Sequence, residues 1–320
     1  IQTGLIQHAA WIQDCLQGVD QLEVHFFWAT GRTLSGNPYY GEDRVVNIGG
    51  QRYGDYFLPY VEAFLKSTPS GVKVRFVGDA LTQASHAPIL TYLSQTYTDR
   101  FQFSLVERVH ANLKTHFPEQ GAALGTVFKN ASHGAPVLCS DIYRLVGMYY
   151  GWENPGPERR SLERNLYVYC DIDLFCDSLL SLATAQAGVN TKDKLKFLSA
   201  LLQKPSVQDP VYIGKCATNN DLIKLHILDA SEYQCFCKNL LSGLNIEASV
   251  FHNFSKVYDE VQNCGQGLPF NPRVGNLLPS AGAYKDNVLS ATGVYFIQRV
   301  AEVSFKGYQG LYQDLEYLDY

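Results

Sequence analysis

The sequence lacks an apolar run long enough to cross a membrane, and it shows no secretory signal peptide. It also lacks an excess of basic residues, because 26 lysines and arginines stand against 31 aspartates and glutamates, a net charge of −5 at pH 7. This charge argues against nonspecific nucleic-acid binding as the main activity. Because the chain starts at Ile1, we expect a fragment without its targeting or membrane-binding segment, so that no membrane contact is visible in it.

The eight cysteines form no Cys-x-x-Cys pair. Several lie in apolar runs, so we expect buried, reduced thiols of the cytosolic kind. Cys235 and Cys237 leave open a soft-metal pair, although no further Cys or His follows at the spacing of a zinc site.

The order of the expected elements indicates an α/β protein. Its 320 residues suffice for a large core. Apolar, β-favouring runs alternate with helical patterns, and this alternation favours a mostly parallel sheet. The expected strands are residues 22–28, 72–77, 101–106 and 166–170, and the helices between the first three are 55–67 and 87–96.

The other segments are less regular. Residues 110–135, with scattered His, Asn and Gly, are interpreted as a loop with a short helix. Residues 177–265 carry helical patterns and two short strand patterns, 210–216 and 222–228, and we expect a helical subdomain inserted in one domain of residues 1–320. The acidic and aromatic tail, 307–320, is either a lid or a frayed end.

Two aspartates come directly after the expected strand 166–170. Asp171 and Asp173 would face the crevice in which open α/β sheets bind ligands. Carboxylate oxygens are the ligands that Mg²⁺ and Mn²⁺ prefer, usually together with substrate phosphates. The pattern therefore predicts a metal–diphosphate site, and the alternative is a chance pair in a solvated loop.

Three further groups are candidate ligands of a substrate. Trp28 ends the first strand and either stacks on a base or closes the core. Asp141 and Arg144 share a helix face after Ser140, an expected N-cap, and form either a surface ion pair or a grip on sugar hydroxyls and oxyanions. Ser290 and Thr292 precede the helical pattern 294–303 and either cap it or hold a phosphate oxygen.

The order of these motifs resembles that of one family. Trp28, the Ser-Asp-Ile-Tyr-Arg run at 140–144, the Asp-Ile-Asp run at 171–173 and the Ser-Ala-Thr-Gly run at 290–293 are similar to motifs of the sugar-binding, Asp-x-Asp-containing glycosyltransferases. Clostridial glucosylating toxins, related bacterial effectors and eukaryotic mannosyltransferase relatives belong to this family. The resemblance covers about the middle half of the chain.

The resemblance implies a GT-A fold, which has a Rossmann-like central sheet, and a retaining transfer from a UDP- or GDP-sugar to a protein or glycan, with Mn²⁺ or Mg²⁺. Trp28 would stack on the base, Asp141 and Arg144 would hold the sugar, and Asp171 would reach ribose or sugar hydroxyls. Asp173 would bind the metal. Ser290 and Thr292 would lie near the sugar or phosphates. The toxin-like motifs imply a secreted bacterial effector that acts in the host cytosol.

The chain also departs from the family pattern. Residues 152–165 separate the helix from the Asp-x-Asp strand, and the family's C-terminal tryptophan is missing. Two other functions therefore stay open. One is a haloacid-dehalogenase-like phosphatase with Asp171 as the nucleophile, and the other is a non-catalytic binding module on the same fold.

Overall fold

The computed structural model describes a central sheet with helices on both sides. The described residues are 19–28, 46–48, 51–53, 61–62, 65, 70–131, 136–153, 165–170, 211–216, 219–225, 227, 229–243, 294–305 and 312–314. Residues 171–210 and 244–293, which include most of the predicted helical subdomain, lie outside them.

Seven described strands form the sheet in the order β5-β4-β1-β6-β8-β7-β9. Neighbouring strands are parallel except at β8, which is antiparallel to both β6 and β7. The predicted α/β class is therefore confirmed, with β5, β4, β1 and β6 as a continuous parallel half. The strands are β1 (Gln21–Trp28), β4 (Val72–Gly78), β5 (Phe101–Leu105), β6 (Asn165–Cys170), β7 (Val211–Cys216), β8 (Asn219–Leu225) and β9 (Tyr312–Asp314). A separate hairpin joins β2 (Val46–Ile48) to β3 (Gln51–Tyr53).

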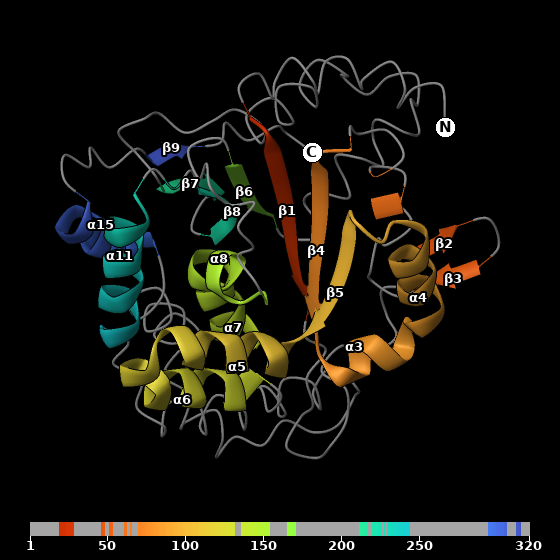
Figure 1. Cartoon of the computed structure of the whole chain (residues 1–320), viewed down its shortest axis with the longest axis horizontal. Helices are drawn as coiled ribbons and strands as arrows, with labels where there is room; N and C mark the ends of the chain where they lie inside the picture. Colours follow the sequence, from red (N-terminus) through yellow and green to blue (C-terminus); the bar gives the residue numbers. More distant parts are fainter. Residues whose placement is uncertain are drawn as a thin grey trace, which may run out of the picture.

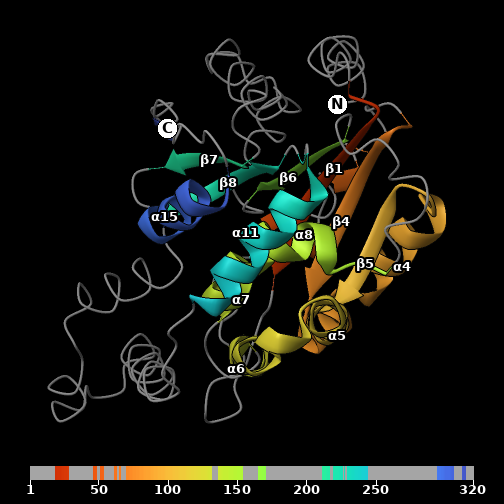
Figure 2. The same ribbon diagram turned by 60° about the vertical axis from the view of Figure 1, so that its left-hand side comes forward.

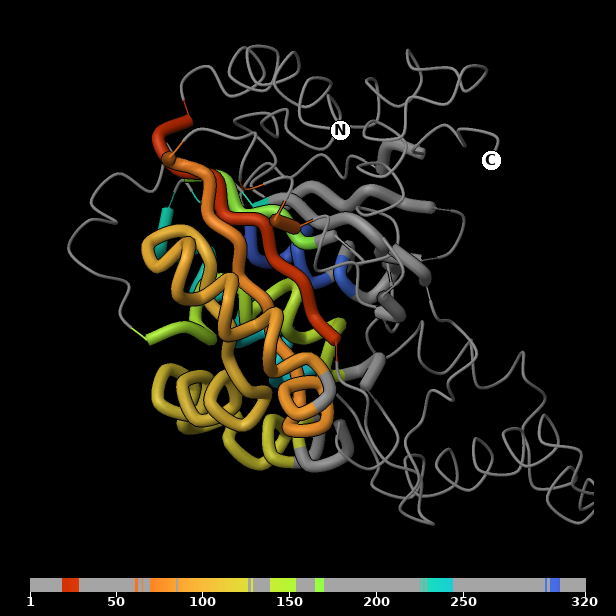
Figure 3. Tube along the Cα trace, turned by 90° about the vertical axis from the view of Figure 1, so that its right-hand side faces the viewer, coloured from red at the N-terminus to blue at the C-terminus, as the bar shows by residue number. Residues whose placement is uncertain are grey.

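The central strand β1 is buried on both faces, as expected of a parallel strand between two helical layers. Side chains alternate along a strand, so Leu22, Val24 and Phe26 face one layer and His25 and Phe27 face the other. All five are buried. Figure 3 shows β1 and β4 side by side.

The helices follow the strands in two groups. Helices α3 (Ala80–Ser85) and α4 (Ala87–Thr96) contact β4 and β5. Helix α5 (Val106–His116), helix α6 (Gly121–Ala131), helix α7 (Pro136–Ile142), a π-helical segment (Tyr143–Gly147) and α8 (Met148–Tyr150) lie on the other side (Figures 1 and 2). The last three are continuous and contact β1, β6 and β8. Helices α11 (Ala230–Ser242) and α15 (Val294–Ser304) pack together beside them.

Helix α11 shows how the sequence defines such an element. Asp229 caps its N-terminus, where its carboxylate accepts hydrogen bonds from the amides of residues 231 and 232. Its buried residues recur at the spacing of one helical face, and this spacing is part of the helical pattern that the sequence shows within residues 177–265. They are Tyr233, Phe236, Cys237, Leu240 and Leu241.

Two interpretations from the sequence are wrong. Residues 110–135 are mostly helical, in α5 and α6, because buried Val109, Leu113, Leu124 and Phe128 keep helical spacing among the polar residues. Ser140 is not an N-cap. Helix α7 already begins at Pro136, a residue that favours the first helical position, so Ser140 lies inside it.

The predicted subdomain at 177–265 contains parts of the main sheet. Strands β7 and β8 fall within this range, and β8 pairs with β6. The domain division itself stays a prediction, because most of the range lies outside the described residues. In the tail, Tyr312–Asp314 forms β9 next to β7. No described helix combines the length and the apolar character that a membrane crossing requires.

Three half-buried histidines make the stability of the protein sensitive to acid. Burial lowers the pKa of His86 to about 4, and burial also lowers the pKa of both His110 and His116. Unfolded histidines bind protons near pH 6.5, whereas the folded protein binds them only at lower pH. The folded state therefore keeps its full stability above pH 6.5 and loses stability as the pH falls toward 4. For His86 we expect a loss of about 1–2 kcal/mol, after allowing for the screening of a partly exposed group.

The His86→Gln variant tests this expectation. Urea unfolding at pH 7 and pH 5 should show a smaller loss of stability for the variant than for the wild type, because glutamine does not titrate. An equal loss in both proteins would show that His86 is not responsible.

Candidate functional site

The strand order indicates where a ligand would bind. From β1 the chain continues to β4 and β5 on one side, and it then returns to β6 on the other side of β1. Open α/β sheets bind ligands at such a switch point, outside the carboxyl ends of the strands. Trp28 ends β1 and Cys170 ends β6, its parallel neighbour. Asp171 and Asp173 follow Cys170 directly in the sequence, but they lie outside the described residues.

Trp28 is half-buried at this edge, so part of the residue remains accessible to solvent. Its backbone carbonyl accepts a hydrogen bond from the hydroxyl of Thr82, at 3.0 Å. Asp79, the N-cap of α3, accepts a hydrogen bond from the amide of Thr82 at 2.8 Å. Its carboxylate also lies 2.8 Å from the Thr82 hydroxyl, whose single hydrogen it shares with the Trp28 carbonyl. A Cβ on Gly78 would lie 2.8 Å from the methyl group of Thr82, so glycine leaves the room that this arrangement needs. The ends of β1 and β4 are therefore fixed to each other.

Asp141 and Arg144 form a buried ion pair. The distance from Nη2 of Arg144 to Oδ1 of Asp141 is 3.3 Å, and the two side chains are 7% and 10% exposed. The expected alternative of a surface ion pair is therefore wrong. Nη2 of Arg144 also donates to the Ser140 hydroxyl at 2.9 Å, and the guanidinium lies 4.6 Å from the ring centroid of Tyr169.

Tyr169 ties this pair to the sheet. It is the last residue but one of β6, and its hydroxyl lies 2.8 Å from that of Ser140. The pair is thus held at the carboxyl end of β6, the strand that precedes the two aspartates. A guanidinium beside a carboxylate at this place can bind the hydroxyls and oxyanions of a ligand.

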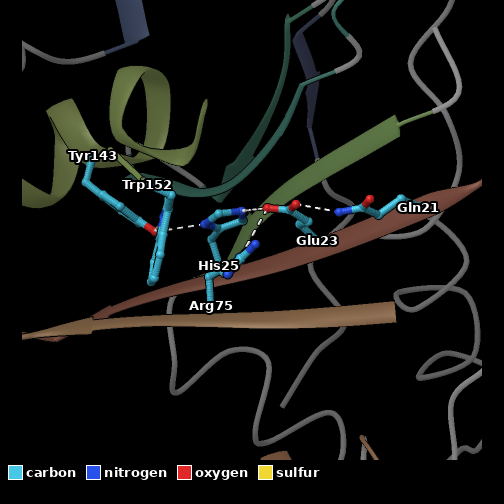
Figure 4. A network of polar contacts seen from close by, with 6 residues as sticks. All are labelled: Gln21, Glu23, His25, Arg75, Tyr143 and Trp152. Carbon is cyan, nitrogen blue, oxygen red and sulfur yellow. Dashed lines mark hydrogen bonds and ion pairs between the residues drawn. The ribbon is translucent and has the colours of Figure 1, made fainter. Parts of the chain in front are cut away.

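A second polar cluster joins β1 and β4 to the π-helical segment (Figure 4). Glu23 and His25 are almost completely buried on β1, and Oε2 of Glu23 lies 3.2 Å from Nε2 of His25 and 3.5 Å from Nε of Arg75 on β4. Nδ1 of His25 lies 2.7 Å from the Tyr143 hydroxyl. Trp152 donates its indole N–H to the same hydroxyl at 3.0 Å.

The sequence interpretation missed this cluster, although a signal was present. A strand of a buried parallel sheet is expected to be apolar throughout. Glu23 and His25 stand two residues apart in such a strand, which places both on one face. Buried ionisable groups of this kind need partners, so two residues of the cluster were predictable in principle.

The metal site stays a prediction. Within the part of the chain that the structure describes, no group of three or more His, Cys, Asp or Glu residues would hold a metal ion. Asp171, Asp173, Ser290 and Thr292 all lie outside this part, so their places relative to Trp28, Asp141 and Arg144 are not defined.

The pair Cys235 and Cys237 does not form a soft-metal site. Both lie on α11, where Cys235 is exposed and Cys237 is buried, because residues two apart point to different sides of a helix. Burial raises the pKa of both Cys139 and Cys237 above the usual thiol value, which leaves these two thiols unreactive. Cys139 and Cys237 are buried free thiols, as predicted, whereas Cys235 is a free thiol that is exposed, so the prediction of a buried thiol is wrong for it.

Comparisons of the chain with family models, with curated proteins and with solved structures find no match. A functional hypothesis therefore depends on the residues and on their arrangement.

Proposed function

We propose that the protein is a metal-dependent retaining glycosyltransferase with a GT-A fold. It would transfer a sugar from a UDP- or GDP-sugar to a protein or glycan acceptor. The observation that carries this proposal is the pairing of β1 with β6 at the switch point of the sheet. The expected base-stacking residue, Trp28, ends one of these strands, and the Asp-x-Asp run directly follows the other.

The buried pair supports the proposal independently. Asp141 and Arg144 were singled out as sugar ligands from the sequence, and they are held against Tyr169 at the carboxyl end of β6. Electrostatic interactions are stronger in a site from which water is largely excluded, so a nearly buried carboxylate and guanidinium are suited to orient a polar sugar. The mixed half of the sheet, beyond β6, is also compatible with a GT-A fold.

The candidate residues would have the following roles. Trp28 would stack on the base, and Asp141 with Arg144 would bind and orient the sugar. Asp171 would reach ribose or sugar hydroxyls, and Asp173 with Asp171 would hold Mn²⁺ or Mg²⁺, while Ser290 and Thr292 would lie near the sugar or phosphates. When bound, such an ion supplies positive charge that stabilises a departing diphosphate.

Hydrolysis of nucleotide sugars in the absence of an acceptor tests the proposal. With Mn²⁺, we expect slow release of sugar from UDP- or GDP-sugars and a rise of the melting temperature with the same donor, because a ligand that binds only the native state stabilises it. Addition of a chelator should abolish the hydrolysis. Turnover of simple phosphate esters would instead favour the phosphatase, and donor binding without any turnover would favour the binding module.

A further inference from the structure

We propose that Tyr143 positions Arg144 for binding of the donor sugar, through hydrogen bonds that anchor the π-helical segment to β1. This inference rests on the proposed function, since it assigns a supporting residue to the same site. In this inference Arg144 touches the donor, and Tyr143 acts only through Arg144.

The first step is the direction of the hydrogen bonds in Figure 4. An indole N–H can only donate, so the Tyr143 oxygen accepts from Trp152 at 3.0 Å. The Tyr143 hydroxyl donates to Nδ1 of His25, at 2.7 Å, in the tautomer of His25 that carries its ring hydrogen on Nε2. In this tautomer the ring hydrogen is on the nitrogen that lies 3.2 Å from the Glu23 carboxylate.

The second step is the charge balance of the cluster. Glu23 also faces the guanidinium of Arg75, and the amide of Gln21 donates to its other oxygen at 2.5 Å. Arg75 in turn lies over the Trp152 ring, 5.0 Å from its centroid. Tyr143 remains a neutral donor, since burial raises the pKa of its hydroxyl well above the usual value. The donors therefore follow one direction, with Trp152 facing the oxygen of Tyr143, Tyr143 facing His25, and His25 facing the Glu23 carboxylate.

The third step connects the cluster with the site. Tyr143 and Arg144 are consecutive residues of the π-helical segment, and such segments are frequent at functional sites. Tyr143 points to β1, whereas Arg144 points to Tyr169 at the end of β6. A hydroxyl fixed on β1 therefore limits how the segment can rotate or slide, and with it the position of the guanidinium.

One further hydrogen bond and the absence of a side chain at Gly147 keep the π-helical segment in this form. A Cβ on Gly147 would overlap the ring of Tyr143, so glycine provides the space in which the ring lies. From α11, the hydroxyl of Tyr233 donates to the backbone carbonyl of Leu145. The segment is thus anchored both to the sheet and to a neighbouring helix.

The Tyr143→Phe variant removes the hydroxyl and keeps the ring. Affinities should be measured for UDP-glucose and GDP-mannose, and for UDP and GDP, which lack the sugar, all with Mn²⁺. With the donor that the wild type binds, we expect an affinity at least about tenfold weaker in the variant, and a change of less than about twofold for the nucleotide alone. Equal weakening of both ligands, or of neither, would overturn the inference.

Two more variants complete the test. Tyr92→Phe also removes a hydrogen-bonded tyrosine hydroxyl, on α4, and it should change neither affinity. If Tyr143→Phe does not fold, Trp152→Phe removes one donor to Tyr143 and should weaken sugar-nucleotide binding selectively, by about threefold. Equal affinities of the Trp152→Phe variant and the wild type for the donor would overturn the inference.

A double-mutant cycle separates this inference from the proposed function. Tyr143→Phe and Arg144→Lys should lose less stability together than the sum of the single losses, because each variant already loosens the same segment. Additive losses would overturn the coupling of the two residues. A wild type that binds no nucleotide sugar would contradict the proposed function, while the cycle would still decide whether Tyr143 positions Arg144.

Discussion

Replacement of Asp141 by alanine is expected to lower the free energy of unfolding by about 3–5 kcal/mol, the cost typical of breaking a buried ion pair. The variant would leave the charge of Arg144 buried, with the Ser140 hydroxyl and the Tyr169 ring beside it. Urea unfolding of both proteins at pH 7 measures this loss. Asp141→Asn should cost less, because an amide still accepts a hydrogen bond from the guanidinium.

The exposed pair Arg108–Glu153 provides a matched control. Its two contacts, 2.8 and 3.1 Å, are at least as short as the contact of the buried pair, but the side chains are 61% and 57% exposed. Glu153→Ala should therefore cost less than about 1 kcal/mol. Similar losses for the exposed and the buried pair would show that burial does not strengthen the dependence of Arg144 on Asp141.

The second large effect concerns activity. Asp173→Ala should lower metal-dependent hydrolysis of the nucleotide sugar by a factor of about 100–1000, the usual effect of removing one preorganised electrostatic group from a catalytic site. The melting temperature without Mn²⁺ should change little, whereas its rise on addition of Mn²⁺ and donor should disappear. Initial rates at saturating Mn²⁺ measure the first effect.

Asp177→Ala is the control for this prediction. Asp177 is a carboxylate four residues further along the chain, outside the Asp-x-Asp run. We expect its variant to keep the wild-type rate and metal dependence. Full activity of the Asp173→Ala variant would exclude Asp173 as a ligand of the ion.

Much of the fold was predictable because it depends on local patterns. The apolar run 22–28 and the turn signals around it give β1, and residues 87–96 form α4 with the predicted bounds. The prediction failed at α5 and α6, where glycines and polar residues lower the helix propensity and packing of buried residues onto the neighbouring layer outweighs it. The order of the strands depends on contacts far apart in sequence, which no local pattern contains.

For the site, the sequence indicated the residue types, and the structure adds burial and partners. Asp141 and Arg144 were predicted at helical spacing, but nothing in that spacing distinguishes an exposed pair from a pair that is 10% and 7% exposed. Tyr169, the partner of Arg144, and His25, the partner of Tyr143, come from strands that are separated from the helix in sequence. Of the residues proposed to bind the donor or metal, only Trp28, Asp141 and Arg144 lie among the described residues.

The central position of β1 has a consequence for the synthesis of the protein. Leu22 pairs with Leu166, so β1 leaves the ribosome long before its second partner exists. At about 5–20 residues per second, the synthesis of the residues between these two leucines takes about 7–30 seconds. During this time one side of an apolar strand is open to mispairing with other nascent chains. Inward-pointing charged side chains discourage such pairing, and Glu23 on this strand would protect the growing polypeptide before it becomes part of the finished interior.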